Sequence, residues 1–126
     1  MSYAANFNTA YLTDQTTATA VGLGAAVNGV RPLGNNLNVF VQQRMSVAAA
    51  TCSVYVILHS ELDGTAPIGI AAPGPQTATA TAARDLAVSG DYWSQILVFA
   101  GSGAPYYEVR HAAPSSGNVD TYTWKA

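Results

Sequence analysis

The residues most able to carry out chemistry stand at the end of one apolar stretch, where His59 and Ser60 are followed by Glu61. A histidine, a serine and a carboxylate are the groups of a nucleophilic triad, in which the histidine activates the serine hydroxyl. However, the stretch 51–60 is predicted as a strand, and neighbouring residues of a strand point to opposite faces of a sheet. His59 therefore cannot activate Ser60 within that strand. The sequence also lacks G-x-S-x-G, H-E-x-x-H and phosphate-loop motifs, so we predict that the protein is not an enzyme.

A metal site would need several convergent ligands, and the sequence offers two partial sets. His59 and His111 each end a predicted strand, and if those strands were neighbours the rings could share a metal with Asp63 or Asp91. We favour two separate rings at the rim of a sheet. Glu61 and Asp63 flank a turn, but calcium takes about six to eight oxygen ligands. We therefore predict no metal and no cofactor.

Cys52 is the one cysteine of the chain, so it can form no internal disulfide and cannot hold zinc alone. No basic residue stands beside it in the sequence to activate the thiol. We interpret Cys52 as a small hydrophobic residue of the core. The glycine-containing stretch 22–29 lacks the third glycine and the βαβ unit of a dinucleotide-binding loop, and we predict an ordinary loop there.

The composition excludes several classes of protein. Charged residues make up 10% of the 126 residues, against about 25% in typical soluble domains, and the net charge is -2. Lys125 is the one lysine, so the chain cannot build the basic stripe of a nucleic-acid-binding protein. The longest apolar runs, 54–58 and 96–100, are far shorter than the roughly 20 residues that span a bilayer, so no membrane segment is predicted.

The N-terminal sequence MSYAANFNTAYL has no basic residue and no apolar segment, so we expect no secretory signal and synthesis in a host cytoplasm. Hydrophobic residues nevertheless make up 49% of the chain, and its mean hydropathy is +0.16. Soluble domains normally use surface charge to stay apart. A chain with so little charge is expected to bind neighbours, first of all other copies of itself.

Short stretches of alternating or β-branched residues recur along the chain between Gly, Pro, Asn and Ser turns, and no stretch shows the period of a helix. The predicted strands are 38–43, 51–60, 68–70, 77–82, 92–99, 106–111 and 119–124. For the end of the fourth, a short helix over 82–86 is the alternative. About eight short strands predict an all-β fold, an antiparallel β-sandwich of jelly-roll type. An immunoglobulin-like strand order fits the same count.

Residues 1–16 fall outside this pattern and are predicted to form an extended N-terminal arm, followed by a single sandwich domain over 17–126. The arm contains Tyr3, Phe7 and Tyr11, which are spaced by four. One turn of amphipathic helix gives the same spacing, but the asparagines and threonines of this segment are weak helix formers. We expect the three aromatic side chains to pack on a partner molecule.

Aromatic residues gather in the last third of the chain at Tyr92, Trp93, Tyr106, Tyr107 and Trp124. In a strand over 92–99, Trp93 shares a face with Leu97 and Phe99, which indicates the core. We predict that the other four aromatic residues form a surface for self-association or for the stacking of sugar rings. The low charge favours self-association, because charged residues are depleted at the centre of protein interfaces.

The arm with Tyr3, Phe7 and Tyr11, a sandwich rich in Ala, Thr, Val and Gly, and the low charge together resemble the small β-sandwich capsid decoration (cement) proteins of tailed bacteriophages. The resemblance covers the whole chain in its general features and carries over no functional residue. It implies a homotrimer on the capsid surface of the virion. Such a trimer staples neighbouring subunits of the major capsid protein and so stabilises the head. We expect Tyr3, Phe7 and Tyr11 of the arm to contact that capsid protein.

Two other functions fit the same features. A jelly-roll module of a tail fibre or lectin type would bind carbohydrate or a receptor through exposed aromatic side chains. A fibre-forming subunit would use its arm to complete a neighbour's sheet by strand addition. The fibre differs from the trimer because its contact between copies does not close on itself.

Overall fold

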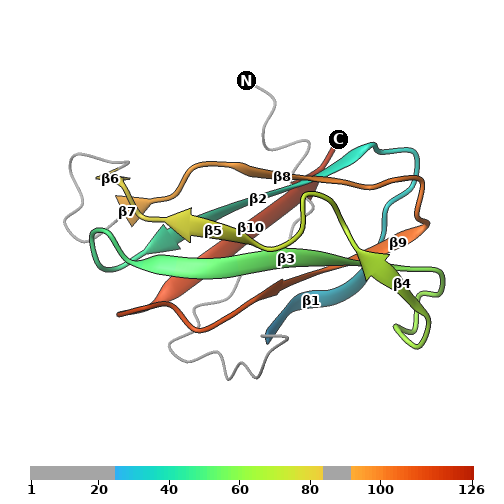
Figure 1. The fold of residues 1–126 in the computed structure, drawn as a ribbon, viewed down its shortest axis with the longest axis horizontal. Helices are drawn as coiled ribbons and strands as arrows, with labels where there is room; N and C mark the ends of the chain where they lie inside the picture. Colours follow the sequence, from blue (N-terminus) through green and yellow to red (C-terminus); the bar gives the residue numbers. More distant parts are fainter. Residues whose placement is uncertain (1–24, 84–91) are drawn as a thin grey trace.

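The protein folds as a sandwich of two antiparallel β-sheets, as predicted (Figure 1). The computed structural model describes residues 25–83 and 92–126, and within these ranges every regular element is a strand. The described residues include no helix with the length and hydrophobicity needed to cross a membrane. The predicted arm, with Tyr3, Phe7 and Tyr11, lies outside the described residues.

Each sheet has five strands, and we name each sheet after its central strand. The β3 sheet has the order β1-β9-β3-β4, with β5 also paired with β3. Its strands are β1 (Ala25–Pro32), β3 (Thr51–His59), β4 (Pro67–Ile70), β5 (Gln76–Thr79) and β9 (Tyr106–His111). The β2 sheet has the order β10-β2-β7-β6, with β8 also paired with β2. Its strands are β2 (Asn38–Met45), β6 (Ala82–Ala83), β7 (Tyr92–Trp93), β8 (Leu97–Ala100) and β10 (Val119–Lys125).

The core lies between the two sheets and is built from alternate residues of the long strands. In β2 the burial alternates strictly, so Val39, Val41 and Met45 face the core while the residues between them face outward. The other sheet contributes in the same way, with Val54 and Val56 of β3 fully buried. Each such side chain stabilises the fold by about 1.5–3 kcal/mol relative to an exposed one.

Most of the predicted strands are confirmed, although the structure has more of them than the eight or so expected. The stretches 38–43, 51–60, 68–70, 106–111 and 119–124 correspond to β2, β3, β4, β9 and β10. The stretch 77–82 divides into β5 and β6. Because Ala82–Ala83 form a strand, the alternative of a helix beginning at residue 82 is wrong there.

The sequence predicts a loop over 22–29, and this prediction is wrong for residues 25–29, which belong to strand β1. The strand pairs antiparallel with β9, and the register shifts between Val27 and Arg31. Gly29 lies in this bulge with a φ of 68°, which glycine adopts without strain. Alanine, asparagine and glycine have weak strand preference, so the pairing with β9, rather than the local sequence, stabilises β1.

The predicted strand 92–99 is also two strands in the structure, β7 and β8. Trp93 pairs with Arg44 and Leu97 pairs with Val41, so three residues of this segment lie opposite two residues of β2. The extra residue forms a bulge, which reverses the faces to which the following side chains point. Leu97 faces the core, whereas Trp93 lies beside the outward-facing Arg44. The prediction of a core position for Trp93 is therefore wrong.

Candidate functional site

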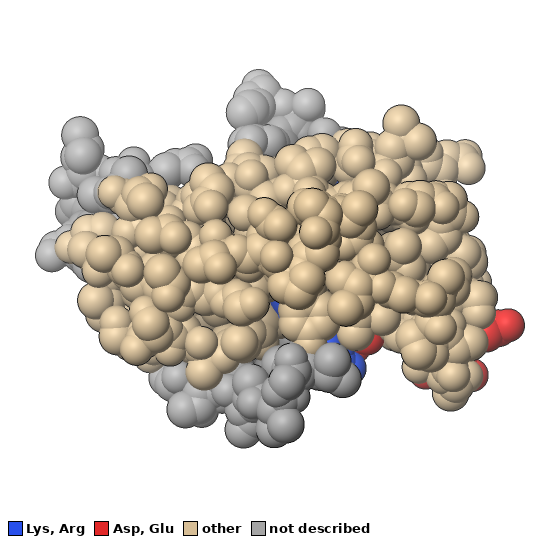
Figure 2. Space-filling model, in the orientation of Figure 1, with Lys and Arg blue, Asp and Glu red and all other residues tan. Residues whose placement is uncertain are grey.

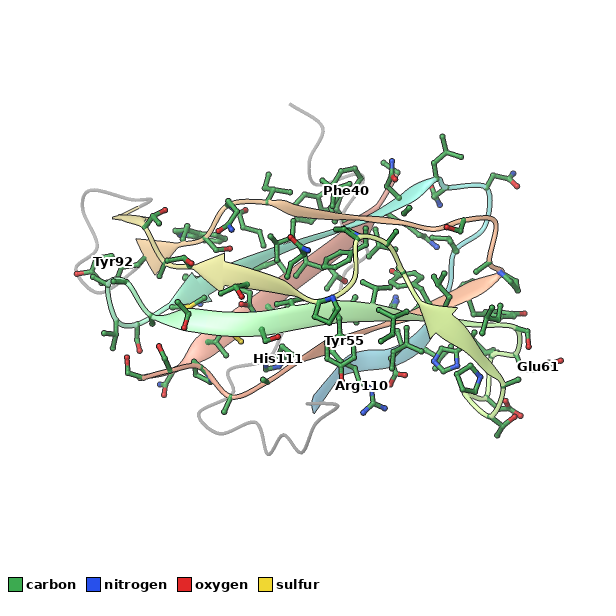
Figure 3. The ribbon with its side chains drawn as sticks, in the orientation of Figure 1. Phe40, Tyr55, Glu61, Tyr92, Arg110 and His111 are labelled. Atoms are coloured by element: carbon green, nitrogen blue, oxygen red, sulfur yellow. The ribbon has the colours of Figure 1, made fainter. Side chains whose placement is uncertain are left out.

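The outer face of the β2 sheet carries a cluster of aromatic side chains that we call the aromatic face. Its members come from three strands and are Phe40, Trp93, Tyr122 and Trp124. Strand pairing brings them together, because Trp124 lies opposite Phe40 and Phe40 lies opposite Val98. An apolar row therefore crosses the sheet from β10 to β8, and Figure 3 labels Phe40, its middle residue.

The rings of the aromatic face contact one another in two pairs. The ring centroids of Phe40 and Trp124 are 5.6 Å apart with an angle of 11° between the planes. The centroids of Trp93 and Tyr122 are 5.2 Å apart with an angle of 32°. Within each pair the face of one ring contacts the other ring, so the contacting faces are covered within the protein. Trp124 is 5% exposed, while the other three are half-buried.

Arg44 fixes the polar end of the aromatic face. It lies opposite Asp120 on β10, and its Nε and Nη2 groups both donate to the same carboxylate oxygen of Asp120. The guanidinium carbon is 6.0 Å from the ring centroid of Trp93 and 5.9 Å from that of Tyr122. The charge of Arg44 is thus balanced by one carboxylate and held over two rings. Gln42 lies on the same face and donates to the Ser94 carbonyl oxygen at 2.9 Å.

The structure does not bring the four predicted surface aromatics together. Tyr107 faces the core and is 1% exposed, which corrects the prediction of a surface role for it. Tyr92 is half-buried and packs against the core, and Tyr106 lies on the outer side of the β3 sheet opposite His59. Of the four, Trp124 alone belongs to the aromatic face. The reason is strand alternation, which places Tyr106 and Tyr107 on opposite sides of β9.

The outer side of the β3 sheet carries a chain of polar contacts. His59 Nε2 lies 3.0 Å from Glu108 Oε1, and Arg110 Nη2 donates to Glu108 Oε2 at 3.0 Å. Tyr55 lies opposite Arg110, and Figure 3 shows both residues on the side of the sandwich away from Phe40. The carboxylate partner of His59 is therefore Glu108 of the neighbouring strand. Ser60, the predicted neighbour, instead donates its hydroxyl to the Ala66 carbonyl oxygen.

The two histidines do not meet. Strands β3 and β9 are neighbours, but they run antiparallel, so His59 and His111 lie at opposite ends of the pair and on opposite faces. Asp63 accepts hydrogen bonds from the backbone and hydroxyl of Thr65, which explains its place in the turn. Asp91 lies outside the described residues. Within the described ranges, no group of three or more His, Cys, Asp or Glu could hold a metal.

Cys52 lies in the core, as predicted, within a polar cluster that the sequence does not indicate. Its thiol donates to the Ala112 carbonyl oxygen at 3.1 Å and lies 3.9 Å from His111 Nδ1. The Gln43 amide donates to Thr121 Oγ1 at 2.9 Å and to Cys52 Sγ at 3.5 Å. The cluster therefore joins β2, β3, β9 and β10 across the space between the sheets.

The cluster is arranged to stay uncharged. Burial raises the pKa of the Cys52 thiol to about 11, and burial lowers the pKa of His111 below its usual value. A reactive cysteine requires a thiolate, which a neighbouring cation normally stabilises. Here both groups favour their neutral forms at neutral pH. The Cys52–His111 contact is thus a structural contact and lacks the charge state of a catalytic pair.

Apolar and uncharged groups dominate the visible surface. Figure 2 shows one face of the molecule on which charged atoms are few and lie in the lower part of the view. The large hydrophobic side chains that are exposed are Leu37, Val47, Leu62, Ile68, Ile70, Ile96 and Val98. Val98 extends the aromatic face, while Ile70 lies on the other sheet opposite Ile57. Both outer faces of the sandwich therefore present apolar side chains.

Comparison with known proteins found a likeness in structure and none in sequence. No protein-family model matches the chain. No curated protein matches it either. A solved structure of a non-crystalline cellulose specific carbohydrate-binding module, CBM28, is similar with a TM-score of 0.46 and 11% sequence identity. The match covers 89% of this chain and 76% of that one. At this TM-score and identity the likeness carries no argument about a ligand.

Proposed function

We propose that this chain is a structural protein that acts by assembly. It associates with copies of itself, most simply as a closed trimer, and decorates a larger protein shell in the manner of a capsid decoration protein. Its partner in that role is the major capsid protein, and its location is the virion surface. The capsid setting comes from the resemblance of the sequence to decoration proteins, and the assembly function comes from the surface described above.

The observation that carries the proposal is the composition of the aromatic face. Tryptophan, tyrosine and arginine are the residues most enriched among those that dominate the energy of protein interfaces, and Trp93, Tyr122 and Arg44 lie together there. The charge of Arg44 is already balanced by Asp120, so a partner covering this face would leave no buried charge unpaired. Val98 adds exposed apolar area next to the rings.

The physical gain from such a contact is the removal of apolar surface from water, about 25 cal/mol per Å² before the costs of association. A stable interface buries roughly 1,200–2,000 Å² in total. Several contacts made at once by an oligomer then strengthen attachment through avidity. A staple that acts in this way needs no catalytic group.

The first experiment measures the absolute mass of the purified protein by light scattering on a sizing column at a high and a low concentration. A stable species of three times 13.0 kDa supports the closed trimer. That species is then mixed with emptied phage heads, and co-sedimentation is measured for the full chain and for a variant lacking residues 1–16. A monomer at both concentrations that also fails to sediment with the heads contradicts the proposal. Particles that grow with concentration indicate the fibre-forming alternative instead.

A carbohydrate-binding function is the second candidate, and the aromatic face is again the observation that favours it. Sugar rings stack on exposed aromatic faces, and Trp93 and Tyr122 are half-buried on one surface. The pairwise ring contacts argue against it, because the rings turn faces toward each other instead of forming a flat platform. A glycan array decides between the two, since a hit that Tyr122→Ala abolishes while folding is retained would favour the carbohydrate function.

A further inference from the structure

Strand β10 forms one edge of the β2 sheet. Among the described strands it pairs with β2 alone, over seven consecutive residue pairs without a shift in register. An edge strand presents a row of backbone groups that can bind another extended chain. The hydrogen bonds at the end of β10 show which of its residues present these groups.

Asn38 and Ala126 exchange two backbone hydrogen bonds, with N···O distances of 3.0 and 3.2 Å. In an antiparallel ladder such hydrogen-bonded pairs alternate with pairs that exchange none. The even-numbered residues of β10 therefore bond to β2, while the odd-numbered residues direct their backbone N–H and C=O groups away from it. We call these the edge residues, and they are Val119, Thr121, Thr123 and Lys125. Within the described part of the chain, no backbone hydrogen bond beyond the ladder involves them.

Two other edge strands, β1 and β5, carry features that hinder strand addition. Strand β1 has a register shift and ends at Pro32, which has no N–H group. In β5 the Gln95 side chain occupies the backbone groups of the edge. It accepts from the Thr79 N–H at 3.2 Å and donates to the Thr77 carbonyl oxygen at 3.1 Å. By contrast, β10 contains no proline, glycine or bulge. Strand β10 is thus better suited than β1 or β5 to receive another strand.

We propose that β10 receives residues 1–16 of a neighbouring copy as an added strand. This inference rests on the self-association proposed above and identifies the surface and the segment that carry it. It assigns the arm to a neighbouring copy in place of the capsid contact expected from the sequence. The 24 residues before β1 span up to roughly 80 Å when extended, which is enough to reach another copy. The edge residues would then bond their N–H and C=O groups to the incoming backbone.

The sequence of the arm suits this position. Tyr3, Phe7 and Tyr11 are separated by even numbers of residues, so an extended arm places all three on one face. Next to β10 that face would continue the aromatic face across the sheet edge, beside Tyr122 and Trp124 of the receiving copy. Aromatic pairs on neighbouring strands each add about 0.2–1 kcal/mol.

Charge is complementary as well. Asp14 is the one charged side chain in residues 1–24. The β10 side of the sandwich carries Lys125, whose ammonium group donates to the Pro32 carbonyl oxygen. Burial lowers the pKa of Lys125, and the nearby positive charge of Arg31 adds to this shift. The negative side chain of the arm therefore approaches an edge with two positive side chains, while the charge of Asp120 is balanced by Arg44.

The test measures amide hydrogen exchange residue by residue, in the full chain and in a variant lacking residues 1–16. The amides of Thr121 and Thr123 should exchange roughly tenfold or more slowly in the full-length oligomer than in the truncated protein. The amides of Tyr122 and Trp124 provide the internal control, because they bond to β2 and should be equally slow in both proteins. Dilution of the full chain below its association midpoint should release the protection at the edge residues.

Each other outcome has a defined meaning. An oligomer whose edge amides exchange as fast as those of the truncated protein overturns the strand addition and leaves self-association intact. A full chain that is monomeric by light scattering overturns the proposed self-association, and the inference with it. Protection that persists in a diluted monomer means that the arm binds its own chain, which overturns exchange between copies.

Point variants keep the test decisive if the truncated protein does not fold. Phe7→Ala in the full chain should weaken association roughly tenfold, the loss expected for one buried aromatic contact. Asn8→Ala is the matched control, because residue 8 lies on the opposite face of an extended arm. Equal association constants for the two variants would overturn the assignment of the aromatic side of the arm to this contact.

Discussion

Phe40 and Trp124 lie directly opposite each other on β2 and β10, and their rings stack with centroids 5.6 Å apart. The two strands come from distant parts of the chain, so this contact fixes their register on the outer side of the sheet. Trp124 is almost fully buried, and Trp124→Ala should lower the free energy of unfolding by about 3–5 kcal/mol. In a double-mutant cycle with Phe40→Ala, the coupling should be about 0.5–1.5 kcal/mol. Strictly additive effects in urea unfolding would contradict a direct ring contact.

Arg44 combines an ion pair with contacts to two aromatic rings, and the two contributions can be separated. Arg44→Lys keeps the charge but loses the planar guanidinium over Trp93 and Tyr122. We expect it to lower the free energy of unfolding by about 0.5–1 kcal/mol. The same loss should appear in an Asp120→Asn background and at high salt, where ion pairs of exposed groups are screened. A loss that disappears in either condition would assign the whole effect to the ion pair.

Gly101 lies where the backbone passes too close to its neighbours for a larger residue. A Cβ atom there would be 2.6 Å from Leu33 Cδ2 and 2.9 Å from the Leu37 carbonyl oxygen. The oxygen belongs to the backbone and accepts the Gly101 N–H, so it cannot move without loss of that bond. Gly101→Ala should lower the free energy of unfolding by about 1–3 kcal/mol. Gly69→Ala is the matched control in a strand, because a Cβ there meets nothing within 4 Å.

The long strands could be predicted from sequence because their alternation is a local property. The sequences of β2, β9 and β10 predict strands whose bounds lie within about two residues of the observed ones, and burial in these strands largely alternates from residue to residue. Strand β1 could not be predicted, since its weak strand formers depend on pairing with β9. The bulge between β7 and β8 is likewise set by pairing with β2, which is why the side of Trp93 was assigned wrongly.

The aromatic face could be predicted only in part for a related reason. Alternation shows that Phe40 and Arg44 share one side of their strand, and that Tyr122 and Trp124 share one side of theirs. It does not show that the two sides coincide, because the register between β2 and β10 is a property of the folded chain. The core cluster of Cys52, Gln43 and Thr121 was missed for the same reason, since its members come from separate strands and both sheets.

His111 should make the protein sensitive to mild acid. Burial lowers its pKa below 6.5, so the unfolded chain takes up a proton at this residue in a range where the folded protein does not. The free energy of unfolding should therefore fall as the pH decreases below 6.5, by at most about 1.4 kcal/mol per pH unit. His111→Gln removes this titration. Urea unfolding at about pH 7.5 and about pH 5.5 measures the difference, and an equal fall in both proteins would assign the effect to other groups.

Cys52 should lower the free energy of unfolding at high pH, whereas His111 lowers it at low pH. Burial raises the pKa of its thiol from 9.0 to about 11, so above pH 9 the unfolded chain loses a proton that the folded protein retains. The free energy of unfolding should then fall as the pH rises from 9 to 11, by about 2–3 kcal/mol in total. Burial also raises the pKa of Tyr55 and of Tyr107, which adds a fall of the same sign at higher pH.

The variant Cys52→Ala separates the thiol from the tyrosines. It loses buried sulfur and the hydrogen bond to the Ala112 carbonyl oxygen, so it should be less stable at neutral pH. Its free energy of unfolding should nevertheless decline less steeply between pH 9 and pH 11, because the thiol no longer titrates there. A thiol reagent gives an independent measurement, since the native protein should react far more slowly than the unfolded chain. Parallel stability curves together with rapid labelling of the native thiol would show that Cys52 is not held neutral in the core.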